Sequence, residues 1–285
     1  MTALRFADID AAAIAEARAR HGAAFGDWRT RALRVAIWAV AIGYLLWSLD
    51  YFSFGKLVAM NERALKMLGA FFVWQDMAGW DYETIYRGLA ETIAMAFLGT
   101  LLGSVAALGI AFFAARNTMP AALPRHLVRR FLDILRGVDG LIWALVFVRA
   151  VGLGPLAGVL AIFVSDAGVL SKLYSEAIEN IDRKQVEGVR ATGASAARVV
   201  RYGYLPQIMP VFVSLSLYSF ESSVRSATVL GIVGAGGIGK VIIDRFLAGH
   251  FDQVAFVVLN VLICVYAIDA ISARIRVHLI GAPRG

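Results

Sequence analysis

The chain of 285 residues is 59% hydrophobic, and only 17% of its residues are charged. A soluble domain usually carries about 25% charged and about 45–50% apolar residues, so this composition, with a mean hydropathy of +0.69, excludes an ordinary soluble enzyme and indicates a membrane protein. The net charge of +7 then matters through its placement along the chain, and no nucleic-acid partner is expected. A single cysteine, Cys264, excludes an internal disulfide.

The N-terminal part carries scattered charges before its first apolar run, which is unlike a cleavable signal sequence. We expect a cytoplasmic tail over residues 1–31 and an extra N-terminal transmembrane helix over 32–50. Residues 51–91 are predicted to lie outside the cytoplasm. Their apolar residues recur at helical spacing, which favours an interfacial helix on the outer leaflet, and a packed extracellular cap explains the pattern equally well.

Five further apolar segments are candidates for membrane spans, which need about 20 residues. They are predicted at residues 92–115, 132–150, 150–171, 205–230 and 254–272. A Gly/Pro break, VGLGP at 151–155, separates the third and fourth of the six spans. We therefore expect an all-α membrane protein with six transmembrane helices and a C-terminal tail over 273–285.

The basic residues divide unevenly between the two sides that six spans define. Most Lys and Arg residues fall on one side, in segments 1–34, 116–130 and 172–201 and in the C-terminal tail. Because cytoplasmic loops carry an excess of Lys and Arg, this side is predicted to be cytoplasmic. We expect a multi-pass protein of the bacterial plasma (inner) membrane with both termini in the cytoplasm.

The segment between the fourth and fifth spans contains a spaced motif. Glu187 precedes Gly193 by six residues, and Leu205 and Pro206 follow that glycine by twelve and thirteen. The spacing resembles the EAA loop of ABC importer membrane subunits, whose pattern is E-A-A-x3-G-x9-I-x-L-P. The departures from the pattern are Gly188, Val189 and Gly203.

Three longer stretches are similar to the permease of phosphonate ABC transporters. They are ETIAMAFLGTLLGSVAALGIAFFAARN (91–117), EAIENIDRKQVEGVRATGAS (176–195) and SSVRSATVLGIVGAGGIG (222–239). The resemblance runs through most of residues 80–272. It implies a type I importer permease with a MetI-like core of five helices over 92–272, plus the N-terminal helix. Such a chain forms the pathway for phosphonate or a related phosphorus oxyanion, and the alternative cargo is phosphate, phosphite or another small solute such as methionine.

The resemblance also implies the partners. Two ATP-binding subunits on the cytoplasmic face hydrolyse ATP, an extracytoplasmic solute-binding protein delivers the solute, and a second permease copy, most simply as a homodimer, completes the pathway within the lipid bilayer. The chain has no complete Walker A, Walker B or ABC signature. We therefore expect it not to be an enzyme and to bind no cofactor itself, with ATP and Mg held by the partner ATPase.

The EAA-like loop, at about 172–206, is expected to dock on the ATPase and to pass its movement to the spans. Two short helices are predicted at 186–191 and 194–202. Gly193 supplies the bend between them, where a Cβ could forbid the turn, and Pro206 begins span five. The residues assigned to coupling are Glu187, Gly188, Arg190, Ala191, Thr192, Gly193, Ala194, Ser195, Leu205 and Pro206.

Ionisable residues inside the predicted spans usually face a partner or an aqueous path. Glu221 and Arg225 are four residues apart, and Arg136 and Asp139 are three apart, so each pair lies on one helix face and can interact. Interhelical ion pairs are the favoured interpretation. The alternative places Arg136 or Arg225 near the oxyanion pathway, and it predicts that Arg225→Ala abolishes uptake. Two further intramembrane charges are Asp166 and Asp269.

The stretch GIVGAGGIGK (231–240) matches the dinucleotide pattern G-x-G-x-x-G and a P-loop without its final hydroxyl. A membrane span precedes it instead of a strand, which disfavours a membrane-bound oxidoreductase, and its outer location favours a gate beside the docked binding protein. Leucines at Gly236 and Gly237 are expected to impair transport and to leave assembly intact. The residues assigned to the pathway or gate are Glu221, Ser222, Arg225, Ser226, Thr228, Arg136, Gly234, Gly236 and Gly237.

Overall fold

In the computed structural model, the part of the chain that is described contains helices and turns but no strand. Described are residues 16, 28–53, 65, 68, 69, 71–74 and 77–280. The chain divides into two compact units, Met1–Lys66 and Met67–Gly285. Most of the predicted N-terminal tail lies outside the described residues, as do residues 54–64 of the segment with the predicted interfacial helix, so both stay predictions.

The first unit contains one long helix, α2 (Trp28–Tyr51). Its part Arg31–Tyr51 is long and apolar enough to cross a membrane, at the place where the sequence predicts the extra N-terminal span. Aromatic rings gather at its C-terminal end, where Trp47 stacks on Tyr51 with ring centroids 5.2 Å apart. Such rings are typical of the boundary between a bilayer and water.

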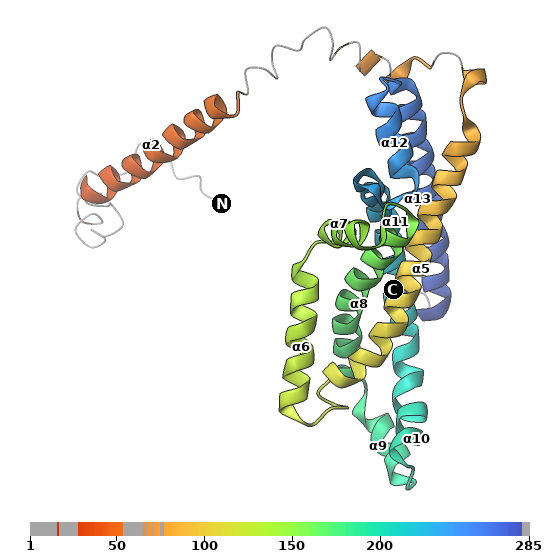
Figure 1. The fold of residues 1–285 in the computed structure, drawn as a ribbon. Helices are drawn as coiled ribbons and strands as arrows, with labels where there is room; N and C mark the ends of the chain where they lie inside the picture. Colours follow the sequence, from red (N-terminus) through yellow and green to blue (C-terminus); the bar gives the residue numbers. More distant parts are fainter. Residues whose placement is uncertain are drawn as a thin grey trace, which may run out of the picture. The chain divides into compact units, whose positions relative to one another are not determined.

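The second unit is a bundle of helices (Figure 1). In chain order they are η3 (Met77–Gly79), α5 (Tyr82–Ala114), α6 (Ala122–Gly137), α7 (Gly140–Val151), α8 (Pro155–Glu179), α9 (Arg183–Ala191), α10 (Ala196–Val199), η4 (Val200–Tyr204), α11 (Leu205–Leu230), η5 (Gly231–Ala235), α12 (Ile238–Leu247) and α13 (Phe251–Ile280).

The helices α5 and α8 pack against each other most extensively, and α11 packs on both. Small residues make this approach close, because a Cβ added at Gly99 would lie 2.6 Å from the Ile162 side chain, and one at Gly103 would lie 2.8 Å from the Cβ of Asp166. A face of small residues is how helices come together in a membrane, where burial of apolar surface gives little drive. The bundle therefore brings Asp166 directly onto α5.

The start of α5 is fixed by an N-terminal cap and by aromatic packing. Asp81 accepts hydrogen bonds from the Thr84 hydroxyl at 2.5 Å and from the Thr84 backbone N–H at 3.1 Å, and these bonds hold the pKa of Asp81 below its usual value. Trp80 packs edge-on against Phe256 of α13, with ring centroids 5.2 Å apart. The cap and the ring contact join the beginnings of α5 and α13.

The predicted third span, 132–150, is wrong as a single helix. The chain turns between α6 and α7, and Asp139 caps α7 by accepting a hydrogen bond from the Leu141 backbone N–H at 2.8 Å. The helix α7 has 12 residues, too few to cross a bilayer alone. Because the turn separates Arg136 from Asp139, the two residues do not share a helix face as predicted.

Four described helical segments are long and apolar enough to cross a membrane: Arg31–Tyr51, Tyr82–Ala114, Pro155–Glu179 and Phe251–His278. A bent pair, Ala196–Ala235 and Ile238–Leu247 with an angle of 58° between them, raises the number to five. These segments coincide with five of the six predicted spans. The last helix, α13, continues past Ser272 to Ile280, into the predicted C-terminal tail.

Candidate functional site

The α9–α10 loop, residues 183–199, consists of two short helices with a sharp bend between them. Asp182 caps α9 by accepting a hydrogen bond from the Lys184 backbone N–H at 3.0 Å. Gly193 makes the bend with φ +74°, and a Cβ there would meet nothing within 4 Å. Glycine is therefore favoured here by the backbone angle, which a residue with a Cβ rarely adopts, as predicted for this bend.

The loop is held against α11 by apolar and polar contacts. Val186 is buried in one cluster with Tyr174 and Phe212. The backbones approach so closely that a Cβ at Gly203 would lie 3.3 Å from the Cα of Val186, which explains the departure from the EAA pattern at this position. Gln207 accepts a hydrogen bond from the Asp182 backbone N–H at 3.0 Å and donates one to the Gly203 carbonyl at 2.7 Å.

Most residues assigned to coupling are exposed at the surface of this loop. The exposed ones are Glu187, Gly188, Arg190, Ala191, Thr192, Gly193, Ser195 and Pro206, and the partly buried ones are Ala194 and Leu205. The loop thus presents a small, basic tip on a fixed base.

Pro206 lies at the start of α11, as predicted. A π-helical turn, η4, precedes α11 without a break, so the continuous helical segment begins at Ala196. Proline has no N–H for the preceding turn and its ring crowds the carbonyl four residues earlier. The wider π turn accommodates it.

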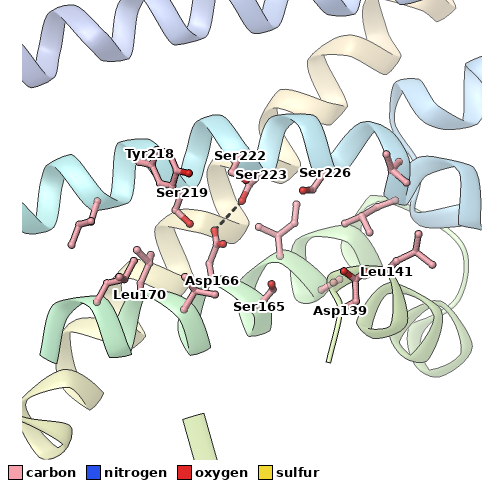
Figure 2. Close-up of a pocket in the computed structure, with 18 residues that line it drawn as sticks. Asp139, Leu141, Ser165, Asp166, Leu170, Tyr218, Ser219, Ser222, Ser223 and Ser226 are labelled. Carbon is pink, nitrogen blue, oxygen red and sulfur yellow. Dashed lines mark hydrogen bonds between the residues drawn. The ribbon is translucent and has the colours of Figure 1, made fainter. Parts of the chain in front are cut away.

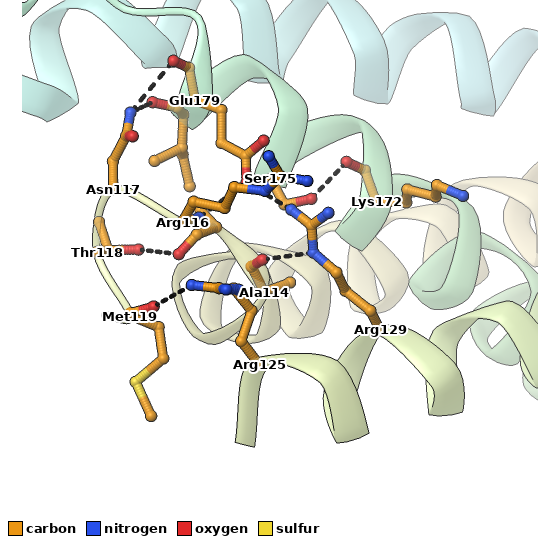
Figure 3. A network of polar contacts seen from close by, with 12 residues as sticks. Ala114, Arg116, Asn117, Thr118, Met119, Arg125, Arg129, Lys172, Ser175 and Glu179 are labelled. Atoms are coloured by element: carbon orange, nitrogen blue, oxygen red, sulfur yellow. Dashed lines mark hydrogen bonds and ion pairs between the residues drawn. The ribbon is translucent and has the colours of Figure 1, made fainter. Parts of the chain in front are cut away.

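A polar network joins the ends of α5, α6 and α8 next to the loop (Figure 3). Glu179 of α8 forms an ion pair with Arg129 of α6 and accepts a hydrogen bond from the Arg116 backbone N–H at 2.8 Å. Arg129 also donates to the Ala114 carbonyl at 2.9 Å, and Asn117 donates to the Ile178 carbonyl at 3.0 Å. The network fixes α8 at the point where the chain enters α9.

A cavity of ≈ 410 Å³ lies between α8, α11 and the start of α7. We call it the serine cavity, because hydroxyls dominate its polar lining (Figure 2). The polar residues that line it are Asp139, Ser165, Asp166, Tyr218, Ser219, Ser222, Ser223 and Ser226. Of the residues assigned to the pathway by sequence, Ser222 and Ser226 lie here.

Asp166 is 7% exposed and joins three helices at this cavity. Its Oδ2 atom accepts hydrogen bonds from the Thr100 hydroxyl of α5 at 2.6 Å and from the Ser223 hydroxyl of α11 at 3.0 Å. The sequence identifies Asp166 as an intramembrane charge but gives no sign of its contact with Thr100 of α5. The serines at three- and four-residue spacing over 219–226 place their hydroxyls on one face of α11.

The charges of α11 pair with charges of α13. Arg225 lies 3.4 Å from Asp269 and Glu221 lies 2.8 Å from Arg276, between Nη1 and Oε1, although the latter contact lacks the angle of a hydrogen bond. The predicted pair of Glu221 with Arg225 is therefore wrong, because each finds its partner on α13. The favoured interpretation of interhelical ion pairs is confirmed for Glu221, Arg225 and Asp269.

Several residues assigned to the pathway lie outside the serine cavity. The hydroxyl of Thr228 donates to the Val224 carbonyl of its own helix at 3.3 Å. Arg136 is exposed at the end of α6, and Glu221 and Arg225 are engaged with α13. Their predicted contact with the solute stays a prediction.

The glycine loop, residues 231–237, is tightly enclosed between α11 and α12. Gly234, Gly236 and Gly237 have φ values of +96°, +82° and +71°, and the Gly234 carbonyl accepts a hydrogen bond from the Gly154 backbone N–H at 3.0 Å. These three glycines also line a second cavity of ≈ 550 Å³ with Lys240 and Asp244. A nucleotide-binding strand and turn is absent from this described segment.

The comparisons with known proteins decide the family. A family model described as the binding-protein-dependent transport system inner membrane component matches residues 99–281, which include the α9–α10 loop, the serine cavity and the glycine loop. The chain belongs to this family. It is thus a permease of the kind found in binding-protein-dependent ABC transporters, and its all-helical MetI-like fold agrees with that of the family.

Two relatives of this permease carry names that specify phosphorus oxyanion transport. It is 38% identical over 90% of both chains to a putative phosphite transport system permease protein of Stutzerimonas stutzeri. It is 49% identical to a putative cryptic phosphonate transport system permease protein of Escherichia coli, over 42% of this chain and 99% of the relative. A solved structure of an inward-facing methionine ABC transporter matches with TM-score 0.60 and 23% identity over 70% of this chain and 97% of that one, which shows the shared fold.

Proposed function

We propose that this permease forms the membrane pathway of an ATP-driven importer for phosphonate or a closely related phosphorus oxyanion. The observation that carries the proposal is the pairing of a hydroxyl-lined cavity with relatives whose names specify phosphite and phosphonate transport. Hydroxyls offer neutral hydrogen-bond donors to an oxyanion, and such contacts release the solute more readily than a guanidinium would.

The exposed α9–α10 loop is the proposed docking site for the ATP-binding subunit. Its base is fixed to α11 by Val186 and Gln207, so a displacement of the loop would move α11 and with it one wall of the serine cavity. ATP and Mg would be bound by that partner. We further propose that the loop and both termini lie in the cytoplasm, as the distribution of basic residues favours.

A second copy of the permease and an extracytoplasmic binding protein complete the proposed complex. The serine cavity is lined by α7, α8 and α11 of one chain, and a two-fold partner would complete the pathway beside it. The glycine loop and its cavity, with Lys240 and Asp244, are the proposed outer gate and the surface next to the docked binding protein.

The proposal is tested with the purified complex of permease, ATPase and binding protein. Its ATPase activity is measured with binding protein loaded in turn with phosphonate, phosphite, phosphate and methionine. We expect stimulation by one or more phosphorus oxyanions and none by methionine. A complex that copurifies and shows no stimulation by any phosphorus oxyanion would contradict the proposal, and stimulation by methionine alone would reassign the cargo.

A further inference from the structure

The charged side chains that line the serine cavity are all carboxylates. Its charged lining residues are Asp139 and Asp166, and no Lys, Arg or His lines it within the described part of the chain. Asp139 caps the start of α7, where its Oδ1 atom accepts a hydrogen bond from the Leu141 backbone N–H. Asp166 points from α8 toward α11 across the cavity (Figure 2). It is the carboxylate that a solute in the cavity would meet.

A phosphorus oxyanion is poorly matched to this lining by charge alone. Coulomb repulsion between like charges is much stronger at membrane depth than in water, and the hydroxyls supply dipoles but no positive charge. Ser223 donates its hydroxyl to Asp166 at 3.0 Å, so that proton is not offered to a solute. An anion that carries its own positive group would meet Asp166 favourably instead.

We propose that Asp166 selects solutes with an ammonium group beside the phosphorus oxyanion, that is, aminoalkylphosphonates. This inference rests on the proposed function and names the substrate class within it. The ammonium pairs with the Asp166 carboxylate, and the phosphonate oxygens accept hydrogen bonds from serine hydroxyls such as those of Ser222 and Ser226. Because Ser226 is three residues beyond Ser223, it lies about 4.5 Å further along α11, a spacing that a two-carbon linker spans.

Asp166 also has a structural role, and the two roles predict different results. Its bonds to Thr100 and Ser223 join α5, α8 and α11, so a purely structural residue would affect every solute alike. Asp166→Asn keeps an oxygen that accepts from both hydroxyls and removes the charge. Asp166→Glu keeps the charge, and Ser223→Ala removes one hydrogen bond and leaves the charge in place.

The test compares 2-aminoethylphosphonate with ethylphosphonate, which lacks the ammonium group. The maximal transport rate of each is measured in proteoliposomes with the full complex, at concentrations that saturate the binding protein, so that selection by the permease is isolated. We expect the wild type to favour the amino compound. Asp166→Asn should lower its rate about tenfold, the loss that corresponds to about 1.4 kcal/mol, with the ethylphosphonate rate unchanged or raised.

The variants that retain the charge should keep the preference. Asp166→Glu should preserve the ratio of the two rates, and Ser223→Ala should change both rates by the same factor. Equal loss of both solutes in Asp166→Asn, or loss of neither, would overturn the inference. If Asp166→Asn does not assemble, a wild-type rate ratio of one or less overturns it. A wild-type complex that moves neither compound nor any other phosphorus oxyanion would overturn the proposed function itself.

Discussion

Gly152 and Gly237 have nearly the same backbone angles and very different surroundings. Their φ, ψ values are 93°, 173° and 71°, −163°, a region that is almost restricted to glycine. A Cβ at Gly152 would meet nothing within 4 Å, whereas one at Gly237 would lie 2.5 Å from the Thr92 hydroxyl and 2.6 Å from Met95. A substitution at Gly152 therefore meets backbone strain alone, whereas one at Gly237 meets both backbone strain and a steric clash.

We predict that Gly237→Ala destabilises the permease more than Gly152→Ala. Both changes should cost about 1–3 kcal/mol in backbone strain, and Gly237→Ala also disturbs the hydrogen bond from the Ile238 backbone N–H to the Thr92 hydroxyl. Thermal unfolding of the detergent-solubilised protein measures the difference. Equal melting temperatures for the two variants would contradict this account. The enclosed site also argues that leucine at Gly236 or Gly237 disrupts folding, contrary to the expectation from sequence that assembly stays intact.

The ion pair of Arg225 with Asp269 favours a structural role for both residues. Their side chains lie 3.4 Å apart on neighbouring helices, and charges at membrane depth are costly unless they are paired. We predict that Arg225→Ala, Asp269→Asn and the double variant lower the free energy of unfolding non-additively, as partners do, and retain most uptake. Abolished uptake in Arg225→Ala alone, with Asp269→Asn fully active, would restore the alternative role beside the solute.

The α9–α10 loop shows what local sequence can predict about an element. Glu187 and Gly193 at fixed spacing indicate the loop, and its two helices and bend are present. The hydrogen bond that joins the loop to α11 was missed, because Gln207 and Asp182 are 25 residues apart and no local pattern links them. The break between α6 and α7 was missed because residues 132–150 have the length of a membrane span, although charged residues are mixed with the apolar ones.

We predict that Gln207→Leu weakens coupling between ATP hydrolysis and transport. The change removes the hydrogen bonds to Asp182 and Gly203. Because Asp182 is exposed and water can replace the lost partner, the expected loss of local stability is about 0.5–1.5 kcal/mol. The loop should then move with less effect on α11, and fewer solute molecules should be carried per ATP hydrolysed. The exposed Gln185 on α9 provides the matched control, since Gln185→Leu should keep the wild-type ratio. The same ratio in both variants would contradict the proposed role of this contact.

At the scale of the whole molecule, composition and three sequence stretches predict an all-helical membrane permease, and the family match confirms it. The five spanning segments that agree with prediction are strongly apolar over most of their length and carry few charges. The sequence assigns Ser222 and Ser226 to the pathway, but the shape of the serine cavity could not be predicted, because it is formed by α7, α8 and α11 and depends on how they pack. The close contact of α5 and α8 that positions Asp166 arises from glycines whose significance appears only when the helices meet.

The central claim is that this chain carries a phosphorus oxyanion across the membrane when a partner hydrolyses ATP. The most direct measurement is accumulation of a radiolabelled phosphonate or phosphite inside proteoliposomes that contain the assembled permease and ATPase, with loaded binding protein on the permease's outer face and ATP on the ATPase side. The account predicts concentrative uptake that requires ATP and the binding protein. ATP hydrolysis by the assembled complex, with no accumulation of any phosphorus oxyanion, would contradict it.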